Sequence, residues 1–319
     1  MTLSILYRGE LSGCNYGCPY CPFAKRVDRP EHLTKDRAQV ERFVDWAQRQ
    51  ADRQLGVFFT PWGEALVRPW YQEALARLSR MPHVVSAAIQ TNLSCTLRWL
   101  ERCDLSALGL WCTYHPGEVS RDTFLKQCRA LDAAGARYSV GVVGLREHFD
   151  EVRALRAGLE DSVYLWVNAY KREPGYYSDA DVDLLAEIDP LFELNNRYYP
   201  TRGRACHAGH SAVSVDGEGT VRRCHFIKAP IANIYERGWA KALESRGCTN
   251  NQCGCHIGYV HLEALELDTV YGQGLLDRIP ERPLSRGETR DRIERFYAGN
   301  RGAPVGVSLT LQGEVIAPQ

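Results

Sequence analysis

The sequence predicts an α/β fold: a partial (β/α)6 barrel of parallel strands with a small Cys-rich C-terminal extension. From the start to about residue 170, short apolar runs alternate with helical patterns. After residue 180 this alternation gives way to a region rich in Cys and His. Alternating strands and helices form parallel sheets with helical crossovers. Six units are too few for an eight-fold barrel and suit an open one, whose chemistry lies at the C-terminal ends of its strands.

The individual elements follow from this pattern. The predicted strands are Leu3–Tyr7, Gly56–Thr60, Val84–Thr91, Leu108–Tyr114, Tyr138–Val143 and Val163–Ala169. The predicted barrel helices are Asp36–Gln50, Pro69–Arg80, Arg121–Ala134 and Glu147–Leu159, and the third crossover, near 97–105, is short. A further helix, Ala180–Ile188, precedes a β-hairpin whose strands Ser211–Val215 and Thr220–Arg223 flank Asp-Gly-Glu-Gly.

The chain divides into three predicted parts. Residues 1–198 form the barrel, 199–270 form the Cys-rich domain, and 271–319 form an Arg-, Pro- and Gly-rich tail without an assigned role. Lys plus Arg total 39 and Asp plus Glu total 39, so the balanced charge does not favour nucleic acid or an anionic membrane as a partner. The apolar run at residues 3–7 is too short for a signal peptide, and no apolar run is long enough to span a membrane, so we expect a cytoplasmic protein.

Twelve cysteines are many for such a chain, and they are clustered. In a reducing compartment, clustered cysteines are more often metal ligands or catalysts than disulfides. One group lies near the N-terminus and a second lies between residues 206 and 255. The four scattered cysteines are expected to be small buried hydrophobic residues: Cys95, Cys103, Cys112 and Cys128.

The first group lies in Cys14-Asn-Tyr-Gly-Cys18-Pro-Tyr-Cys21, directly after the first predicted strand. Gly and Pro keep this segment a loop. Three thiolates from one loop can hold three irons of a four-iron cluster and leave the fourth iron open for chemistry, whereas structural sites use four protein ligands. A zinc knuckle or a redox-active cysteine pair is the alternative interpretation.

This Cys-x3-Cys-x2-Cys segment, with an aromatic residue before its last Cys, resembles the signature of the radical S-adenosylmethionine (SAM) superfamily. The resemblance implies that Cys14, Cys18 and Cys21 bind a [4Fe-4S] cluster, and that Tyr20 lies against the adenine of SAM. In that family the open iron binds the methionyl amine and carboxylate. Reductive cleavage then gives a 5′-deoxyadenosyl radical, which abstracts hydrogen. A low-potential donor such as flavodoxin or ferredoxin would supply the electron.

Two further segments resemble motifs of the same family. Thr-Pro-Trp-Gly-Glu at 60–64 resembles its Gly-Gly-Glu segment, with Trp62 in place of the first Gly; a carboxylate and exposed carbonyls can receive an ammonium group. Segment 140–147 resembles the strand that contacts adenine, without its first Gly. The implied cofactor-binding residues are Gly63, Glu64, Val142 and Gly144.

The second group reads Cys206-x12-Gly-x4-Cys224 across the hairpin, followed by Cys248-x4-Cys253-x-Cys255. It resembles the twitch and SPASM extensions, which carry auxiliary [4Fe-4S] clusters. A full SPASM domain uses about seven cysteines for two clusters, so five imply one cluster, as in the twitch subgroup. We expect Cys206, Cys224, Cys253 and Cys255 as ligands. Cys253 and Cys255 are separated by one residue, a short spacing for two ligands of the same cluster, so Cys248 could replace one of them as a ligand. A structural zinc site is the alternative.

Two residues near the predicted mouth are candidate catalytic groups. His115 could transfer a proton, or instead cap the next helix or contact the ribose. Lys171 could bind a carboxylate. The resemblance implies an oxidoreductase that oxidises or cross-links a peptide or protein side chain. We expect no leader-peptide-binding domain before the first strand, which keeps open a dehydrogenase or rearrangement enzyme acting on a small molecule such as an aminosugar. A non-catalytic iron–sulfur electron carrier is the alternative of another class.

Overall fold

The protein is described from a computed structural model that covers residues 2–23 and 26–298. A nine-stranded sheet has the order β10-β9-β8-β1-β2-β3-β4-β5-β6. Strands β1 to β6 lie side by side in chain order, and each neighbouring pair is parallel. Their bounds are β1 Leu3–Arg8, β2 Leu55–Phe59, β3 Val84–Thr91, β4 Leu108–Tyr114, β5 Arg137–Val143 and β6 Leu165–Asn168. The predicted α/β fold with an open, parallel partial barrel is confirmed.

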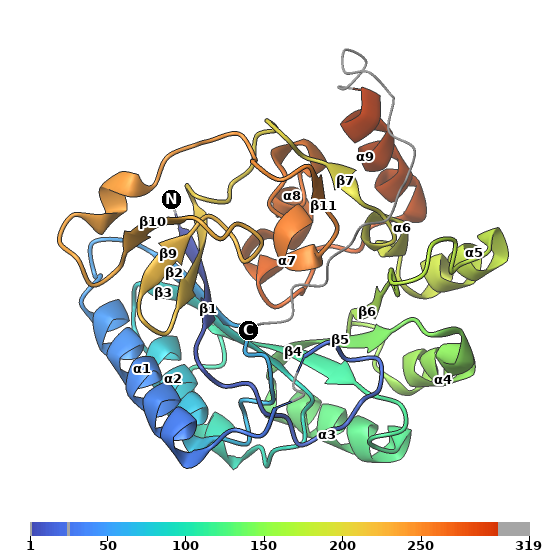
Figure 1. Cartoon of the computed structure of the whole chain (residues 1–319). Helices are drawn as coiled ribbons and strands as arrows, with labels where there is room; N and C mark the ends of the chain where they lie inside the picture. Colours follow the sequence, from blue (N-terminus) through green and yellow to red (C-terminus); the bar gives the residue numbers. More distant parts are fainter. Residues whose placement is uncertain (1, 24–25, 299–319) are drawn as a thin grey trace.

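Helices cover the outer, convex face of this sheet (Figure 1). They are α1 Pro30–Gln48, α2 Pro69–Ser79, α3 Arg121–Ala134 and α4 Phe149–Gly158, and the short third crossover holds only the 3-10 helix η1 Arg98–Arg102. Proline at the first helical positions starts α1 and α2, because its missing N–H has no partner to lose there. Among the described residues, none of the helices combines the length and the apolar character that a membrane crossing requires.

Side chains of the strands alternate between this outer core and the barrel interior. Tyr7 on β1 faces outward and packs on Phe43 of α1, with ring centres 4.4 Å apart. The interior cluster contains Leu6, Phe58, Ala88, Trp111, Trp166 and Leu276. The interior is therefore a packed aromatic core below a polar mouth.

The C-terminal half extends the sheet beyond β1. Strand β8 Ala212–Asp216 pairs in parallel with β1, and the antiparallel strands β9 Thr220–Arg222 and β10 Pro230–Asn233 continue the sheet. The predicted hairpin thus belongs to the barrel's own sheet. A second, two-stranded sheet joins β7 Tyr199–Pro200 to β11 Gln252–Cys253. The remaining elements are α5 Asp179–Ile188, α6 Phe192–Asn195, α7 His256–Tyr259, α8 Asp268–Tyr271, α9 Arg286–Ala298 and 3-10 helices η2 Arg146–His148, η3 Trp239–Ala242, η4 Glu263–Leu265 and η5 Gly272–Leu275.

Residues 276–278 of the predicted tail pack into the interior of the barrel, whereas α9 packs on α6 and η4. The hydroxyl of Ser139 donates to the carbonyl of Asp277 at 2.6 Å, and Asp277 is fully buried. The guanidinium carbon of Arg278 lies 3.2 Å and 3.1 Å from the ring centres of Trp111 and Trp166. Residues 299–319, the end of that predicted tail, lie outside the described residues.

Candidate active site

The loop after β1 carries the first cysteine group and is fixed at its base by two carboxylates. Asp28 accepts hydrogen bonds from the backbone N–H of Ser12 at 3.1 Å and of Gly13 at 2.7 Å. Asp36, fully buried on α1, accepts from the N–H of Leu11 at 3.0 Å. Hydrogen bonds from backbone donors to carboxylates are among the stronger ones in proteins. The start of the cysteine loop is therefore held before any cofactor binds.

Cys14, Cys18 and Cys21 lie together on this loop at the C-terminal end of β1. Cys18 is buried, and the other two are partly exposed. Burial raises the pKa of the Cys14 thiol, and that of Cys18 to about 11. Among the residues that the structure describes, no three Cys, His, Asp or Glu side chains surround one point as the ligands of a single metal ion do. A four-iron cluster requires a different arrangement, because each thiolate binds its own iron. The donor chemistry of the loop fits such a cluster.

The loop after β2 presses directly on the cysteine loop through Gly63. A Cβ atom at Gly63 would lie 1.8 Å from the carbonyl oxygen of Gly13, which real structures do not tolerate. The next N–H, that of Glu64, donates to the same carbonyl at 3.2 Å. Only glycine permits this approach. The two predicted motifs are therefore in contact beside Cys14.

The Glu64 carboxylate is buried and has three protein donors. It accepts hydrogen bonds from the N–H of Leu66 at 2.9 Å, the hydroxyl of Thr91 at 2.8 Å and the N–H of Asn92 at 2.5 Å. Burial raises the pKa of this carboxyl group, and the hydrogen bonds oppose that shift. Glu64 is the residue that the resemblance places near the methionyl amine of SAM. In the structure its carboxylate links the loop after β2 to the end of β3 through hydrogen bonds.

His115, at the end of β4, reaches the cysteine loop. Its Nδ1 lies 3.0 Å from the hydroxyl of Tyr20 and 3.3 Å from the Sγ of Cys18. Burial lowers the pKa of His115 to about 4, so the imidazole is neutral at neutral pH. Burial also raises the pKa of Tyr20. The structure places both predicted residues against Cys18.

The predicted residues at the end of β5 occupy two different environments. Val142 is fully buried in the core between the sheet and its outer helices. Ser139 and Gly141 face the interior, and Val142 alternates with them, so a contact of Val142 with adenine stays a prediction that its backbone groups would have to fulfil. Gly144 donates from its N–H to the carbonyl of Asn168 at 2.9 Å, at the mouth.

Lys171, just after β6, is tied to backbone carbonyls. Its Nζ donates to Asn195 O at 2.5 Å, to Arg197 O at 3.4 Å and to Gly254 O. Burial lowers the pKa of Lys171 to about 8. The ammonium group has three protons and three protein acceptors. Lys171 therefore anchors the segment that carries the last two cysteines to the end of β6.

The second cysteine region is assembled from segments that are distant in sequence. Strand β11 brings Cys253 beside β7, and the backbone of Cys248 bonds with Gly203 and Arg204 at 2.7 and 2.9 Å. The buried guanidinium of Arg223 donates to the carbonyls of Ala208 at 3.1 Å and of residues 246 and 247 at 2.5 Å each. Arg223 thereby holds together the chain segments that carry Cys206, Cys224 and Cys248.

The thiols of this region affect one another electrostatically, and Cys255 differs from the others in being exposed. Burial, and then the thiols of Cys224 and Cys248, raise the pKa of Cys206 to about 11. The pKa of Cys253 is raised by burial and then by all four other thiols of the region. Burial lowers the pKa values of Arg8, Lys171 and Arg278, and a negative charge on the exposed Cys255 thiol raises them in part.

The sequence analysis missed Asp28, Asp36, Arg223 and Arg278. Each of these side chains contacts backbone groups or aromatic rings of segments that are distant along the chain. A spacing between neighbouring residues therefore cannot reveal them. Arg278 is the clearest case, because an isolated Arg in an Arg-rich segment normally faces water. The one available signal is that the surrounding segment contains several apolar residues among its charges.

Comparisons with known proteins show the fold. No protein-family model and no curated protein matches this sequence. The structure is similar to that of native anSMEcpe with bound AdoMet (S-adenosylmethionine): identity is 15%, the TM-score is 0.51, and the match covers 94% of this chain and 98% of that one. A histidine-tagged form of anSMEcpe with AdoMet, and native anSMEcpe with AdoMet and Kp18Cys peptide, match with 14% identity, TM-scores of 0.51 and the same coverage.

Proposed function

We propose that this protein is a radical SAM enzyme that oxidises or cross-links a peptide or protein side chain. The observation that carries the proposal is the three-cysteine loop at the mouth of a parallel partial barrel, held in place by Asp28, Asp36 and Gly63. The likeness to anSMEcpe, solved with AdoMet and also with AdoMet and a peptide, supports this class and favours a peptide over a small molecule.

A [4Fe-4S] cluster bound by Cys14, Cys18 and Cys21 would supply reductive cleavage of SAM and, from it, a hydrogen-abstracting radical. The protein's own residues prepare the surroundings. His115 is neutral at neutral pH and lies 3.3 Å from the Sγ of Cys18, so its ring can form a hydrogen bond there without adding positive charge. The aromatic interior around Trp111 and Trp166 excludes water below the mouth, which protects reactive intermediates.

We assign the second cluster to Cys206, Cys224, Cys248 and Cys253. The exposure of Cys255, and the anchoring by Arg223 of the segments that carry Cys206, Cys224 and Cys248, support this set over one that contains Cys255. Four thiolates leave no open iron, so this site would transfer electrons or support the fold. Zinc suits four thiolates as well, and metal analysis separates the two metals.

The test is the metal content of protein purified and reconstituted without oxygen. About eight irons per chain are expected for two four-iron clusters, and about four in the Cys14/Cys18/Cys21 triple Ala variant. Stoichiometric zinc in the second site of anaerobically purified protein would contradict the second cluster. An iron-free first site after reconstitution would contradict the proposed function itself.

The expected net reaction is oxidative and consumes SAM. After hydrogen abstraction the substrate is a carbon radical, and oxidation requires the loss of one more electron and a proton. One 5′-deoxyadenosine should therefore form per product, with deuterium transferred irreversibly from labelled substrate into it. Return of deuterium to the substrate without consumption of SAM would instead indicate a rearrangement enzyme.

A further inference from the structure

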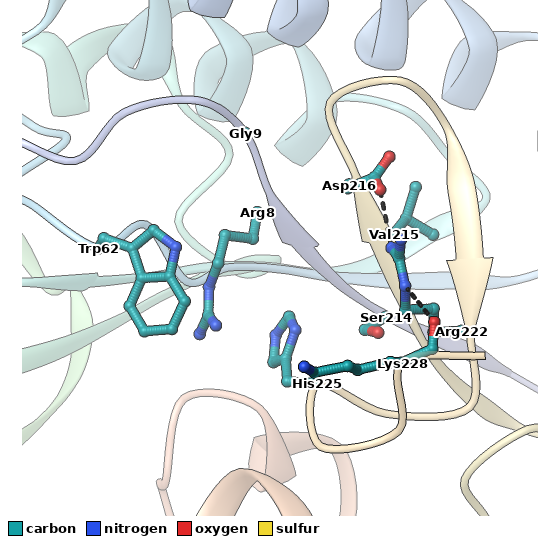
Figure 2. A pocket seen from close by; sticks show the side chains of 9 residues that line it. All are labelled: Arg8, Gly9, Trp62, Ser214, Val215, Asp216, Arg222, His225 and Lys228. Carbon is teal, nitrogen blue, oxygen red and sulfur yellow. Dashed lines mark hydrogen bonds and ion pairs between the residues drawn. The ribbon is translucent and has the colours of Figure 1, made fainter. Parts of the chain in front are cut away.

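A cavity of about 430 Å³ lies between the end of β1, the loop after β2, the hairpin of β8 and β9, and the segment between β9 and β10. Figure 2 shows Arg8, Trp62, His225 and Lys228 extending toward the same space from these elements. The complete lining is Arg8, Gly9, Trp62, Ser214, Val215, Asp216, Arg222, His225 and Lys228.

The lining contains more positive than negative charge. Arg8, Arg222 and Lys228 are cations, and Asp216 is the only carboxylate among the lining residues. Asp216 is already used, because its Oδ2 accepts from Nη1 of Arg222 at 2.7 Å. Within the described residues, neither Arg8 nor Lys228 forms an ion pair. Two cationic groups therefore face the cavity without a carboxylate of their own.

The guanidinium of Arg8 is positioned rather than free to rotate. Its Nε donates to the carbonyl of Thr60 at 2.7 Å, and its carbon lies 3.8 Å from the ring centre of Trp62. Stacking on an aromatic ring and one fixed hydrogen bond restrict the plane of the group and leave its terminal nitrogens available. A planar, pre-oriented guanidinium suits two-pronged binding of an oxyanion.

The cavity lies between the two cysteine groups. Trp62 packs on Phe23, two residues after Cys21, with ring centres 4.4 Å apart. On the other side His225 directly follows Cys224, and its Nε2 lies 3.1 Å from the hydroxyl of Thr60 at the end of β2. A group bound in this cavity would therefore be held beside the barrel mouth, next to both candidate cluster sites.

We propose that Arg8 and Lys228 form a subsite for an oxyanion of the substrate, a carboxylate or a phosphate. The assignment to the substrate rests on the proposed function. The subsite requires the substrate to carry an acidic group near the atom that reacts. A peptide with an acidic side chain or a terminal carboxylate meets this requirement, and so does a phosphorylated one.

The test measures binding of inorganic phosphate and of acetate to the reconstituted protein without oxygen, by ³¹P line broadening and by ¹H saturation transfer. Lys228 is exposed, so Lys228→Gln should fold normally. Loss of one charge-assisted contact should weaken binding about tenfold. Lys126→Gln, at an exposed position on α3, is the matched control and should bind as the wild type does. The better-bound probe identifies the acidic group as phosphate or carboxylate.

Equal binding by the Lys228→Gln and Lys126→Gln variants, or no binding of either probe to the wild type, would overturn the proposal. Equilibrium dialysis with SAM provides the second readout: its affinity should be unchanged in Lys228→Gln. A parallel loss of SAM affinity would assign the cations to the cosubstrate and overturn the substrate subsite. Lys228-dependent phosphate binding by a protein that never cleaves SAM would preserve the subsite and defeat the proposed function.

Discussion

Replacement of Gly63 by Ala should displace the first cysteine loop. The added Cβ would lie 1.8 Å from the carbonyl oxygen of Gly13, whereas ordinary contact begins at 3.4 Å, so the two loops must separate by about 1.6 Å. Overpacking of this kind and loss of the hydrogen bond from Glu64 to Gly13 should together cost about 2–4 kcal/mol of unfolding free energy. Because Cys14 follows Gly13, occupancy of the first cluster should fall as well.

Gly17→Ala is the matched control for this prediction. Gly17 lies between Cys14 and Cys18, yet a Cβ there would meet only an Oε1 of Glu118 at 3.7 Å. Iron analysis after anaerobic reconstitution and thermal unfolding should show normal values for Gly17→Ala and a loss approaching four irons for Gly63→Ala. Equal iron in the two variants, or a greater loss in Gly17→Ala, would refute the packing argument.

Three further predictions follow from single side chains. Cys248→Ala should lose about four irons while Cys255→Ala keeps about eight, and the reverse result would restore Cys255 as a ligand. Arg223→Gln should be destabilised by about 3 kcal/mol in urea unfolding and should lose the second cluster while it keeps the first; an unchanged iron content would show that Arg223 does not assemble that site. Burial raises the pKa of Asp277 from 3.8 to about 6 in the folded protein. The buried carboxylate therefore destabilises the fold fully above about pH 6, and this cost disappears as the pH falls below 3.8, the pKa in the unfolded chain. Asp277→Asn should therefore stabilise the protein by up to about 3 kcal/mol at pH 8, with the gain vanishing near pH 4, and a gain independent of pH would contradict this cause.

The barrel could be predicted because its signal is local. Each of the six strands is a short apolar run, and each has a residue range in the structure close to the predicted one. The start of α1 differs: the structure begins it at Pro30, whereas the sequence predicted Asp36. Residues 30–35 are mostly exposed and carry no apolar periodicity, so only the proline at the first helical position marks the beginning.

The candidate site was predictable where closely spaced residues define it, as in Cys14, Cys18 and Cys21. The role of Gly63 needed the structure, because the close approach to Gly13 joins two loops that are about fifty residues apart in the chain. The side on which Val142 lies could not be predicted for a different reason. A family motif gives the position of a residue along a strand, but not the face of the sheet on which its side chain lies. The contact of Ser139 with Asp277 shows that Ser139 faces the barrel interior, and the alternation of side chains along β5 then places Val142 on the opposite face.

The most direct test of the central claim is formation of 5′-deoxyadenosine when the reconstituted protein is reduced by dithionite with SAM in the absence of oxygen. We expect 5′-deoxyadenosine from the wild type and a reduced amount from Cys206→Ala, which keeps the first cluster. We expect none from Cys18→Ala. An iron-loaded wild type that forms no 5′-deoxyadenosine, or a Cys18→Ala variant that forms as much as the wild type, would contradict the central claim.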